Sequence, residues 1–259
     1  MHELFDPSGE ERIRSRSRGR AEGPDLRGTR TGDTGRMTTR ASRTTTKPPK
    51  IDGRRPVELD DGDAGDLAAH TTVERMRYSD VDLSGLDLAG VTLSECELTG
   101  VSVDGTDFTS ARMVDTRIER MHAPKFSASR STLHNVRIVG SRIGALDLYD
   151  SGLRSVVVTD SKISLINLRA GNLRDVLFRG CIIDELDLAE ANLTRVAFED
   201  SRIGDLDVNR ATLAHVDFRG AEIGVIRNLD GLRGSTISGH QAVALAGLFA
   251  AHLGIRIDS

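Results

Sequence analysis

The sequence is poor in aromatic residues, since its 259 residues include 7 Phe, 2 Tyr and no Trp. Aromatic rings supply the stacking platforms of proteins that bind single-stranded nucleic acids, the cages that hold quaternary ammonium groups and the grooves that bind Pro-rich peptides. The composition argues against all three. The hydrophobic fraction is nevertheless 38 %, so aliphatic side chains must fill the core.

Cysteines and long apolar segments are also scarce. Two cysteines make no case for the disulfide framework of a small secreted protein. The chain does not open with a secretory signal pattern, and its longest apolar run, near residues 242–253, is too short to cross a bilayer. We therefore expect a soluble cytoplasmic protein that does not engage a membrane.

Charge is distributed unevenly, although the net charge is only −4. Residues 1–50 carry 12 Lys/Arg against 7 Asp/Glu, and residues 1–70 lack apolar periodicity, which predicts a disordered, basic, low-complexity tail. Such a tail is either a solvated extension or an arm that contacts nucleic acid. Outside the tail we expect no direct nucleic-acid binding. Met37, where the composition changes, is a candidate for the true start of the chain.

From residue 76 the sequence becomes strictly periodic. A central residue, almost always apolar and large, recurs at every fifth position from Tyr78 to Ile223, and the position two before it is small or apolar. Residues 76–225 hold 17 basic and 23 acidic side chains, and none falls in either column. The chemistry also repeats every twenty residues, as in the column Val136, Val156, Val176, Val196 and Val216. Neither a helix nor a flat strand has these periods, so we expect a four-sided solenoid.

Individual repeats resemble a known family. Ala191–Arg195 (ANLTR) and Leu186–Leu188 (LDL) are similar to the motif of the pentapeptide-repeat family, which is a small residue, Asp or Asn, Leu or Phe, and two polar residues. The resemblance covers residues 76–225. It implies an all-β, right-handed quadrilateral β-helix of about 7.5 coils, with the central residue and the residue two before it facing inward. The tail and the C-terminal end resemble an actinobacterial subgroup of that family.

One coil departs from the motif. Ala123 and Ala128 occupy central positions, whereas Met121 and Phe126 occupy the neighbouring positions that are usually small. The exchange predicts either volume compensation inside the coil or a local bulge that exposes Phe126. Because the five-residue register is never interrupted, we expect no long inserted loop.

The sequence offers no catalytic constellation. Its seven histidines show no metal-ligand spacing, and Cys96 and Cys181 fall in inward columns, where we expect buried core residues. No nucleotide-binding loop, nucleophile elbow or metalloprotease motif is present. A filled, narrow coil also leaves no internal pocket. We therefore predict that the protein is not an enzyme and has no catalytic residues, cofactor or metal.

After residue 226 the repeat stops, and residues 226–259 are predicted to form a C-terminal cap. Ser238 can cap a helix over about residues 239–253, with Gly254 as its terminator. A solenoid must cover its last coil, so capping is one expected role. In the gyrase-protecting members of the family that the chain resembles, a C-terminal helical segment also makes the dimer. The candidate cap or homodimer residues on the apolar stripe of this helix are Leu245, Phe249 and Leu253.

Two outer surfaces are candidate interaction sites. The first is an acidic face, defined by the repeating column Asp87, Asp107, Asp147, Asp187 and Asp207. In the family, an acidic rod of DNA-like dimensions can occupy the DNA-binding groove of a type II topoisomerase. The column also matches the plain Asp/Asn preference of the motif. The second surface is an apolar flank at outward positions, represented by Val157, Leu177 and Ile182.

These observations favour a non-enzymatic pentapeptide-repeat protein that serves as a protein-interaction scaffold, with a partner that the sequence does not name. The alternative is a DNA mimic that protects or inhibits a type II topoisomerase such as gyrase, with a link to quinolone-type resistance. The two functions differ in whether the acidic column is free to meet a basic groove.

Overall fold

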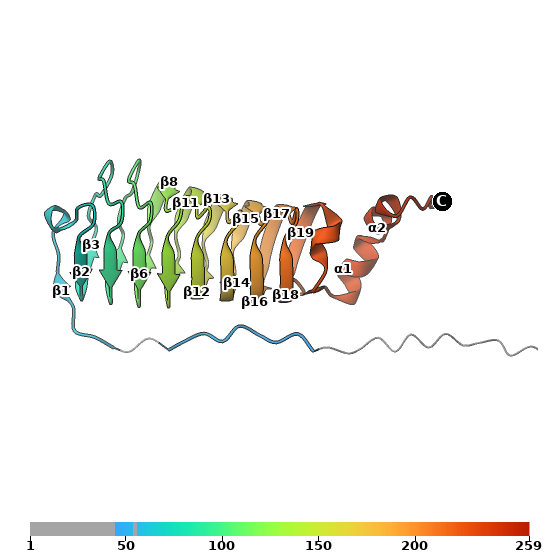
Figure 1. Cartoon of the computed structure of the whole chain (residues 1–259), viewed down its shortest axis with the longest axis horizontal. Helices are drawn as coiled ribbons and strands as arrows, with labels where there is room; N and C mark the ends of the chain where they lie inside the picture. Colours follow the sequence, from blue (N-terminus) through green and yellow to red (C-terminus); the bar gives the residue numbers. More distant parts are fainter. Residues whose placement is uncertain (1–44, 54–55, 259) are drawn as a thin grey trace, which may run out of the picture. The chain divides into compact units, whose positions relative to one another are not determined.

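The computed structural model describes residues 45–53 and 56–258. The proposed start at Met37 and most of the predicted basic tail lie outside these residues. The fold is a parallel β-solenoid of about nine turns, followed by two short helices (Figure 1). Except at the two ends of the coil, paired strands lie twenty residues apart, so that Leu153 stands beside Leu173, and Leu173 beside Leu193. The predicted all-β coil is confirmed.

The strands form two sheets. The long sheet contains one ladder of ten strands, namely β1 (Asp60–Asp61), β3 (Met76–Ser79), β5 (Glu97–Thr99), β7 (Arg117–Glu119), β10 (Arg137–Val139), β12 (Gly152–Thr159), β14 (Asn172–Arg179), β16 (Asn192–Glu199), β18 (Thr212–Asp217) and β20 (Ser235–Thr236). A side branch joins it at β12 and consists of β2 (Thr72–Glu74), β4 (Thr92–Ser94), β6 (Arg112–Val114) and β9 (Thr132–His134). The six-stranded sheet contains β8 (His122–Ser127), β11 (Arg142–Asp147), β13 (Lys162–Asn167), β15 (Ile182–Asp187), β17 (Ser201–Asp207) and β19 (Ala221–Arg227).

The interior is filled by stacked ladders of like side chains. Phe178, Phe198 and Phe218 stack with ring centroids 4.9 and 5.0 Å apart, which is the spacing of adjacent strands. The predicted inward columns are buried along the coil, and both cysteines, Cys96 and Cys181, are buried free thiols. The cross-section of the coil is narrow, so its interior is filled mainly by aliphatic side chains and phenyl rings. The scarcity of larger rings in the sequence follows from this.

The coil with exchanged residues keeps its register. Phe126 is 3 % exposed and stacks on Phe108 of the preceding coil, with ring centroids 4.9 Å apart. The small side chain of Ala128, which is fully buried, leaves the room that the phenyl ring uses. Volume compensation is therefore confirmed, and the alternative of an exposing bulge is wrong.

The solenoid is longer than the 7.5 predicted coils. At its start, β1 pairs with β3, and Leu67 and Val73 are buried, although residues 56–75 follow the five-residue motif poorly. At its end, β20 pairs with β18 after the 3-10 turn η2 (Leu229–Leu232). The prediction of disorder up to residue 70 is thus wrong for residues 56–70, which include β1 and the 3-10 turn η1 (Ala64–Asp66), because backbone pairing with the next coil orders them.

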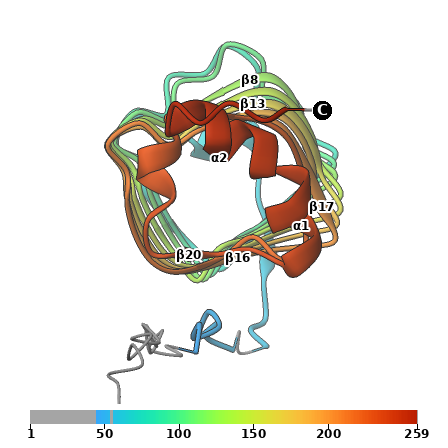
Figure 2. The ribbon, with the colours of Figure 1, turned by 90° about the vertical axis from the view of Figure 1, so that its right-hand side faces the viewer.

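The C-terminal segment forms two helices in place of the one predicted. α1 (Gly239–Ala244) begins after Ser238, which caps the helix as predicted and forms a capping box with Gln241, and α2 (Ala246–His252) follows a break at Leu245. Figure 2 shows both helices lying across the end of the coil. Gly254 has a positive φ of 71° and ends the helical segment.

Candidate interaction surfaces

The predicted acidic column consists of carboxylates that hold turns. Each accepts a hydrogen bond from the backbone N–H two residues further on, at 2.8–3.2 Å, which is an Asx turn. Hydrogen bonds from the side chain and the backbone of Thr109 lower the pKa of Asp107. The five carboxylates that share this role are Asp87, Asp107, Asp147, Asp187 and Asp207.

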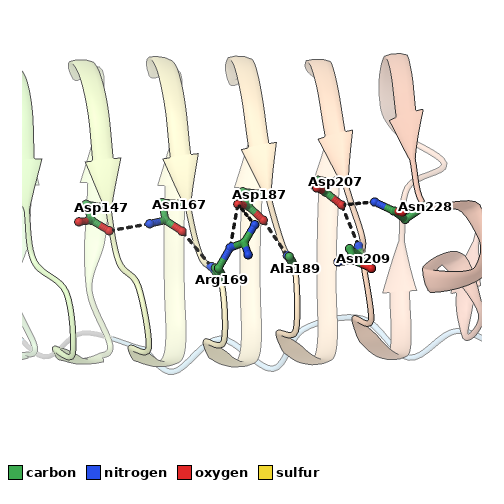
Figure 3. A network of polar contacts seen from close by, with 8 residues as sticks. All are labelled: Asp147, Asn167, Arg169, Asp187, Ala189, Asp207, Asn209 and Asn228. Carbon is green, nitrogen blue, oxygen red and sulfur yellow. Dashed lines mark hydrogen bonds and ion pairs between the residues drawn. The ribbon is translucent and has the colours of Figure 1, made fainter.

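Neighbouring side chains engage the same column (Figure 3). The amide of Asn167 donates to Asp147 at 2.9 Å, and the guanidinium of Arg169 lies 3.2 Å from Asp187. Ser127 takes the register position between the second and third carboxylates. The column is therefore an interrupted row of engaged carboxylates and lacks the dense free charge of a polyanion.

The predicted apolar flank is divided between two sheets. Val157 and Leu177 lie in β12 and β14 of the long sheet, where each is only 8 % exposed. Ile182 begins β15 of the six-stranded sheet and is 48 % exposed. The three residues do not form one surface, because the chain turns a corner of the coil between residues 177 and 182.

Residues 45–53, which we call the strap, cover the long-sheet part of that flank. Ile51 packs against a cluster formed by Val157, Leu177 and Ala197. The strap is drawn in blue in Figure 1, beside β12 to β18. The sequence assigned this segment to a disordered tail because its composition is polar and Pro-rich, and that assignment is wrong for these residues. A single aliphatic residue, Ile51, is the sequence signal that could have found the contact.

The backbone of the strap meets one corner of the coil. The N–H of Lys50 donates to Asp175 Oδ1 at 2.8 Å, and the N–H of Asp52 donates to Ser155 Oγ at 2.8 Å. Asp175 is 5 % exposed and Ser155 is 1 % exposed. Both belong to a column with positive φ at twenty-residue intervals, which we call the corner column and which comprises Asn135, Ser155, Asp175 and Arg195.

The carboxylate of Asp175 is the main charged hydrogen-bond acceptor at this corner. Burial disfavours its charged form, but hydrogen bonds from Arg195 and from the Lys50 N–H, with the nearby charges of Arg195 and Arg174, outweigh that cost and lower its pKa. Arg195 donates to it through two nitrogens, at 2.5 and 2.6 Å. Asp175 is therefore ionised at neutral pH and anchors both the next coil and the strap.

Side chains of the long sheet also contact the far end of the strap. Arg137 donates to the backbone carbonyl of Asp52 at 2.7 Å, and His134 Nε2 lies 3.6 Å from the carboxylate of Asp52. At the other end, the hydroxyls of Thr46 and Thr236 share a hydrogen bond. The strap thus spans from the last strand, β20, back to the coil that holds β9 and β10.

Charges on the six-stranded sheet are segregated along the coil axis. Strands β8, β11 and β13 present, beside the single carboxylate Asp147, the basic group of His122, Lys125, Arg142 and Lys162. Strands β15, β17 and β19 present, beside the two cations Arg202 and Arg227, the acidic group of Asp184, Glu185, Asp205 and Glu222. The charges of the two groups cancel when they are summed over the whole length of the face. A sum for each strand separately, which the sequence allows, reveals the basic and the acidic group.

Three glycines lie in the middle of that face, in a column that they share with Pro124, Ser164 and Asp184. At Gly144, Gly204 and Gly224 an added Cβ atom would lie 2.3–2.6 Å from a carbonyl oxygen of the preceding coil. Glycine therefore fits best at these three positions, and in their coils the backbone is bare between two rows of longer side chains.

The C-terminal helices are only partly packed on the coil. The side-chain amide of Gln241 donates to the carbonyls of Phe218 and Ala221 at 2.7 Å each, which attaches α1 to the last coil. Of the predicted stripe, Leu245 packs on the core and Phe249 is half-buried, whereas Leu253 is 70 % exposed. The other exposed aliphatic residues of this segment are Val243, Leu248, Ile255 and Ile257.

A hollow of about 650 Å³ lies between the last coil and α2, with Asp230 and His252 3.5 Å apart in its lining and no Ser, Thr or Cys there. No group of three His, Cys, Asp or Glu side chains within residues 45–53 and 56–258 could hold a metal ion. Over the same ranges, no helix is long and apolar enough to span a membrane.

Comparison with known proteins identifies the repeat. The model of the family described as pentapeptide repeats matches eight copies, over residues 79–113 and 172–204. No curated protein sequence matches the chain. Between the two matched ranges the coil continues without a break in register.

The solved structures to which the chain is similar are distant from it. QnrB1, a plasmid-mediated fluoroquinolone resistance protein, is 15 % identical, with a TM-score of 0.38, and the match covers 69 % of this chain and 100 % of that one. HetL, a pentapeptide-repeat protein involved in heterocyst differentiation regulation in the cyanobacterium Nostoc sp. strain PCC 7120, is 14 % identical, with a TM-score of 0.22 and coverages of 66 % and 88 %. The family is indicated by the repeat and not by these structures: the chain contains eight copies of the pentapeptide repeat, within one continuous coil.

Proposed function

We propose that the protein is a non-enzymatic interaction scaffold in the cytoplasm, and that its partner binds the face of the six-stranded sheet. The observation that carries the proposal is the segregation of charge on that face, from the group around Arg142 and Lys162 to the group around Asp184 and Glu185. A partner with the reverse arrangement of charges is both attracted and oriented by it. Gly144, Gly204 and Gly224 carry no side chain between the charged rows, which lets the partner backbone approach closely at those three coils.

The proposal is tested by reversing the basic group. The variant Arg142→Glu with Lys162→Glu removes the segregation, whereas the control Arg112→Glu with Arg130→Glu makes the same change in net charge on other, exposed positions. We expect affinity capture from the native host, quantified by mass spectrometry, to recover one partner with the wild type and the control but at least tenfold less with the first variant. Equal recovery with all three proteins would refute the proposal.

A second candidate function is that of a DNA mimic that protects or inhibits a type II topoisomerase. The acidic end of the six-stranded sheet favours it, since β15, β17 and β19 carry six carboxylates when Asp187 and Asp207 are included. Three coils measure about 14 Å along the axis, a length over which duplex DNA carries about eight charges. Because Arg202 and Arg227 offset two of the six, the net density is about half that of DNA.

The two functions are separated by a supercoiling assay with purified gyrase, with and without a fluoroquinolone. A DNA mimic alters supercoiling near stoichiometric amounts, and replacing Asp184, Glu185 and Glu222 by the corresponding amides should abolish the effect. A scaffold with another partner leaves supercoiling unchanged even in excess.

The exposed aliphatic residues of the cap support a further part of the proposal, a homodimer formed through the C-terminal helices. Val243 and Leu253 are 78 % and 70 % exposed on neighbouring helices. A second copy would remove these side chains from water, which favours association by about 25 cal/mol per Å² of buried apolar area.

A further inference from the structure

The strap is bound to the coil in the way that a peptide ligand is bound to a receptor. Residues 45–53 form no strand with either sheet. Two backbone N–H groups, those of Lys50 and Asp52, instead reach buried side-chain acceptors on Asp175 and Ser155. Between them, the side chain of Ile51 enters the apolar cluster. This combination of main-chain hydrogen bonds and one side-chain pocket is the usual basis of extended-peptide recognition.

The corner column holds a third acceptor that the strap does not use. Asn135 is 3 % exposed, and its Oδ1 atom has no hydrogen-bond partner among the described residues, while its amide nitrogen donates to Asp115. A buried acceptor without a donor costs free energy. It lies one coil beyond Ser155 in the column, where the next N–H of an extended ligand would meet it.

The strap is also held by few anchors. Ile51 is its one aliphatic contact with the cluster and is only half-buried, and Lys50 and Asp52 are exposed residues. Segments with few buried contacts open at a lower free energy than the core that they cover. Pro48 and Pro49 precede the anchors and keep the chain extended, which reduces the entropy lost on binding.

We infer that the corner column and the Val157–Leu177–Ala197 cluster form a recognition site for an extended polypeptide, which the strap occupies within its own chain and an extended segment of a partner protein occupies when the strap leaves. The inference rests on the proposed scaffold function and adds a second surface to it. The ligand carries an aliphatic residue with a free backbone N–H on either side. A carboxylate after that residue, as in Asp52, lies beside His134, and the backbone carbonyl of the same residue accepts a hydrogen bond from Arg137.

The test uses the full chain with Ile51→Ser, which removes the aliphatic anchor and leaves the coil unchanged. Hydrogen exchange at the amides of Lys50 and Asp52 should accelerate at least tenfold. A fluorescent peptide of residues 45–53 should then bind the variant saturably and bind the wild type at least tenfold more weakly, because the tethered strap competes at a high effective concentration. The control Ile182→Ser, a matched change on the other sheet, should behave as the wild type.

A second peptide tests whether the corner column binds the backbone N–H groups of its ligand. N-methylation of the Lys50 and Asp52 amides removes both donors while keeping the side chains, and should reduce binding to the Ile51→Ser variant at least tenfold. Equal binding of the two peptides, no binding to the variant, or unchanged exchange at the two amides would each overturn the inference. The scaffold proposal is tested separately by the Arg142 and Lys162 reversal, so one can fail while the other stands.

Discussion

Asp175 and Arg195 form a bidentate ion pair between adjacent coils, with Nε–Oδ1 and Nη2–Oδ2 distances of 2.5 and 2.6 Å. The residues are twenty positions apart, and both have a positive φ. Their side chains are 7 % and 13 % exposed, so the pair is held largely out of water. The same carboxylate accepts the N–H of Lys50, which couples the stacking of two coils to the seating of the strap.

Removal of one charge from this pair should destabilise the coil. Asp175→Asn keeps the shape of the side chain but leaves the guanidinium of Arg195 without its counter-charge. Loss of one partner from a largely buried pair costs about 2–4 kcal/mol, whereas Asp217→Asn, which breaks the more exposed pair with Arg219, should cost under about 1 kcal/mol. Urea unfolding followed by circular dichroism measures both. Equal losses in the two variants would contradict the interpretation of Asp175 as a buried anchor.

Acid should weaken the fold through the same carboxylate. The pKa of Asp175 is lowered in the folded protein from its ordinary value of 3.8, so the group stabilises the fold at pH values above about 4. That contribution is lost as the pH falls below 4 through the folded-state pKa. We expect the free energy of unfolding to fall more steeply between pH 4 and about pH 2 in the wild type than in Asp175→Asn. Parallel pH profiles would argue against it.

Truncation of a phenylalanine should destabilise the coil more in the middle of the phenylalanine ladder than at its end. Phe198 stacks on both Phe178 and Phe218, whereas each of these stacks on one ring of the ladder. Phe198→Ala should therefore cost about 3–5 kcal/mol and more than Phe178→Ala. Phe198→Leu refills most of the space and should cost much less. Thermal and urea unfolding of the three variants provide the comparison, and the reverse order would show that ring stacking is not what matters.

The phenol of Tyr78 should lose its proton at a higher pH than an ordinary tyrosine. Burial raises its pKa to about 12, with smaller contributions from the charges of Cys96, Asp66 and Asp63. In Tyr149→Phe, Tyr78 is the sole phenol, so that tyrosinate absorbance reports on it alone. A raised pKa stabilises the fold below pH 10, and this contribution is lost as the pH rises from 10 towards 12. Titration near pH 10 with the circular dichroism spectrum unchanged would contradict the burial of this ring.

The coil could be predicted from the sequence because its period is long and every coil repeats the same requirement. Any charged residue in the columns of Leu153 or Val156 would lie among stacked aliphatic side chains, and none is found there. The ends were harder to predict, because β1 and β20 pair through their backbones and need no particular side chain. Backbone pairing leaves little trace in a five-residue pattern.

The surfaces were less predictable than the core. The column of Asp187 and Asp207 looks like a free acidic face in the sequence, but each carboxylate is turned onto a nearby backbone N–H. The outward aliphatic residues Val157 and Leu177 look like a site for another protein, yet Ile51 of the same chain lies on them. Contacts between segments more than one hundred residues apart have no period and leave only single residues as clues.

Dimerisation through the cap is the prediction that links the C-terminal helices to function. The double variant Val243→Asp with Leu253→Asp replaces two side chains that are 78 % and 70 % exposed by carboxylates. Because neither side chain is buried, the coil itself should keep its stability. We expect the wild type to sediment as a dimer and the double variant as a monomer, while Ile182→Asp, which changes an exposed aliphatic residue far from the cap, stays dimeric. A wild type that remains monomeric at high concentration would show that these helices only cover the last coil, where Gln241 already attaches them.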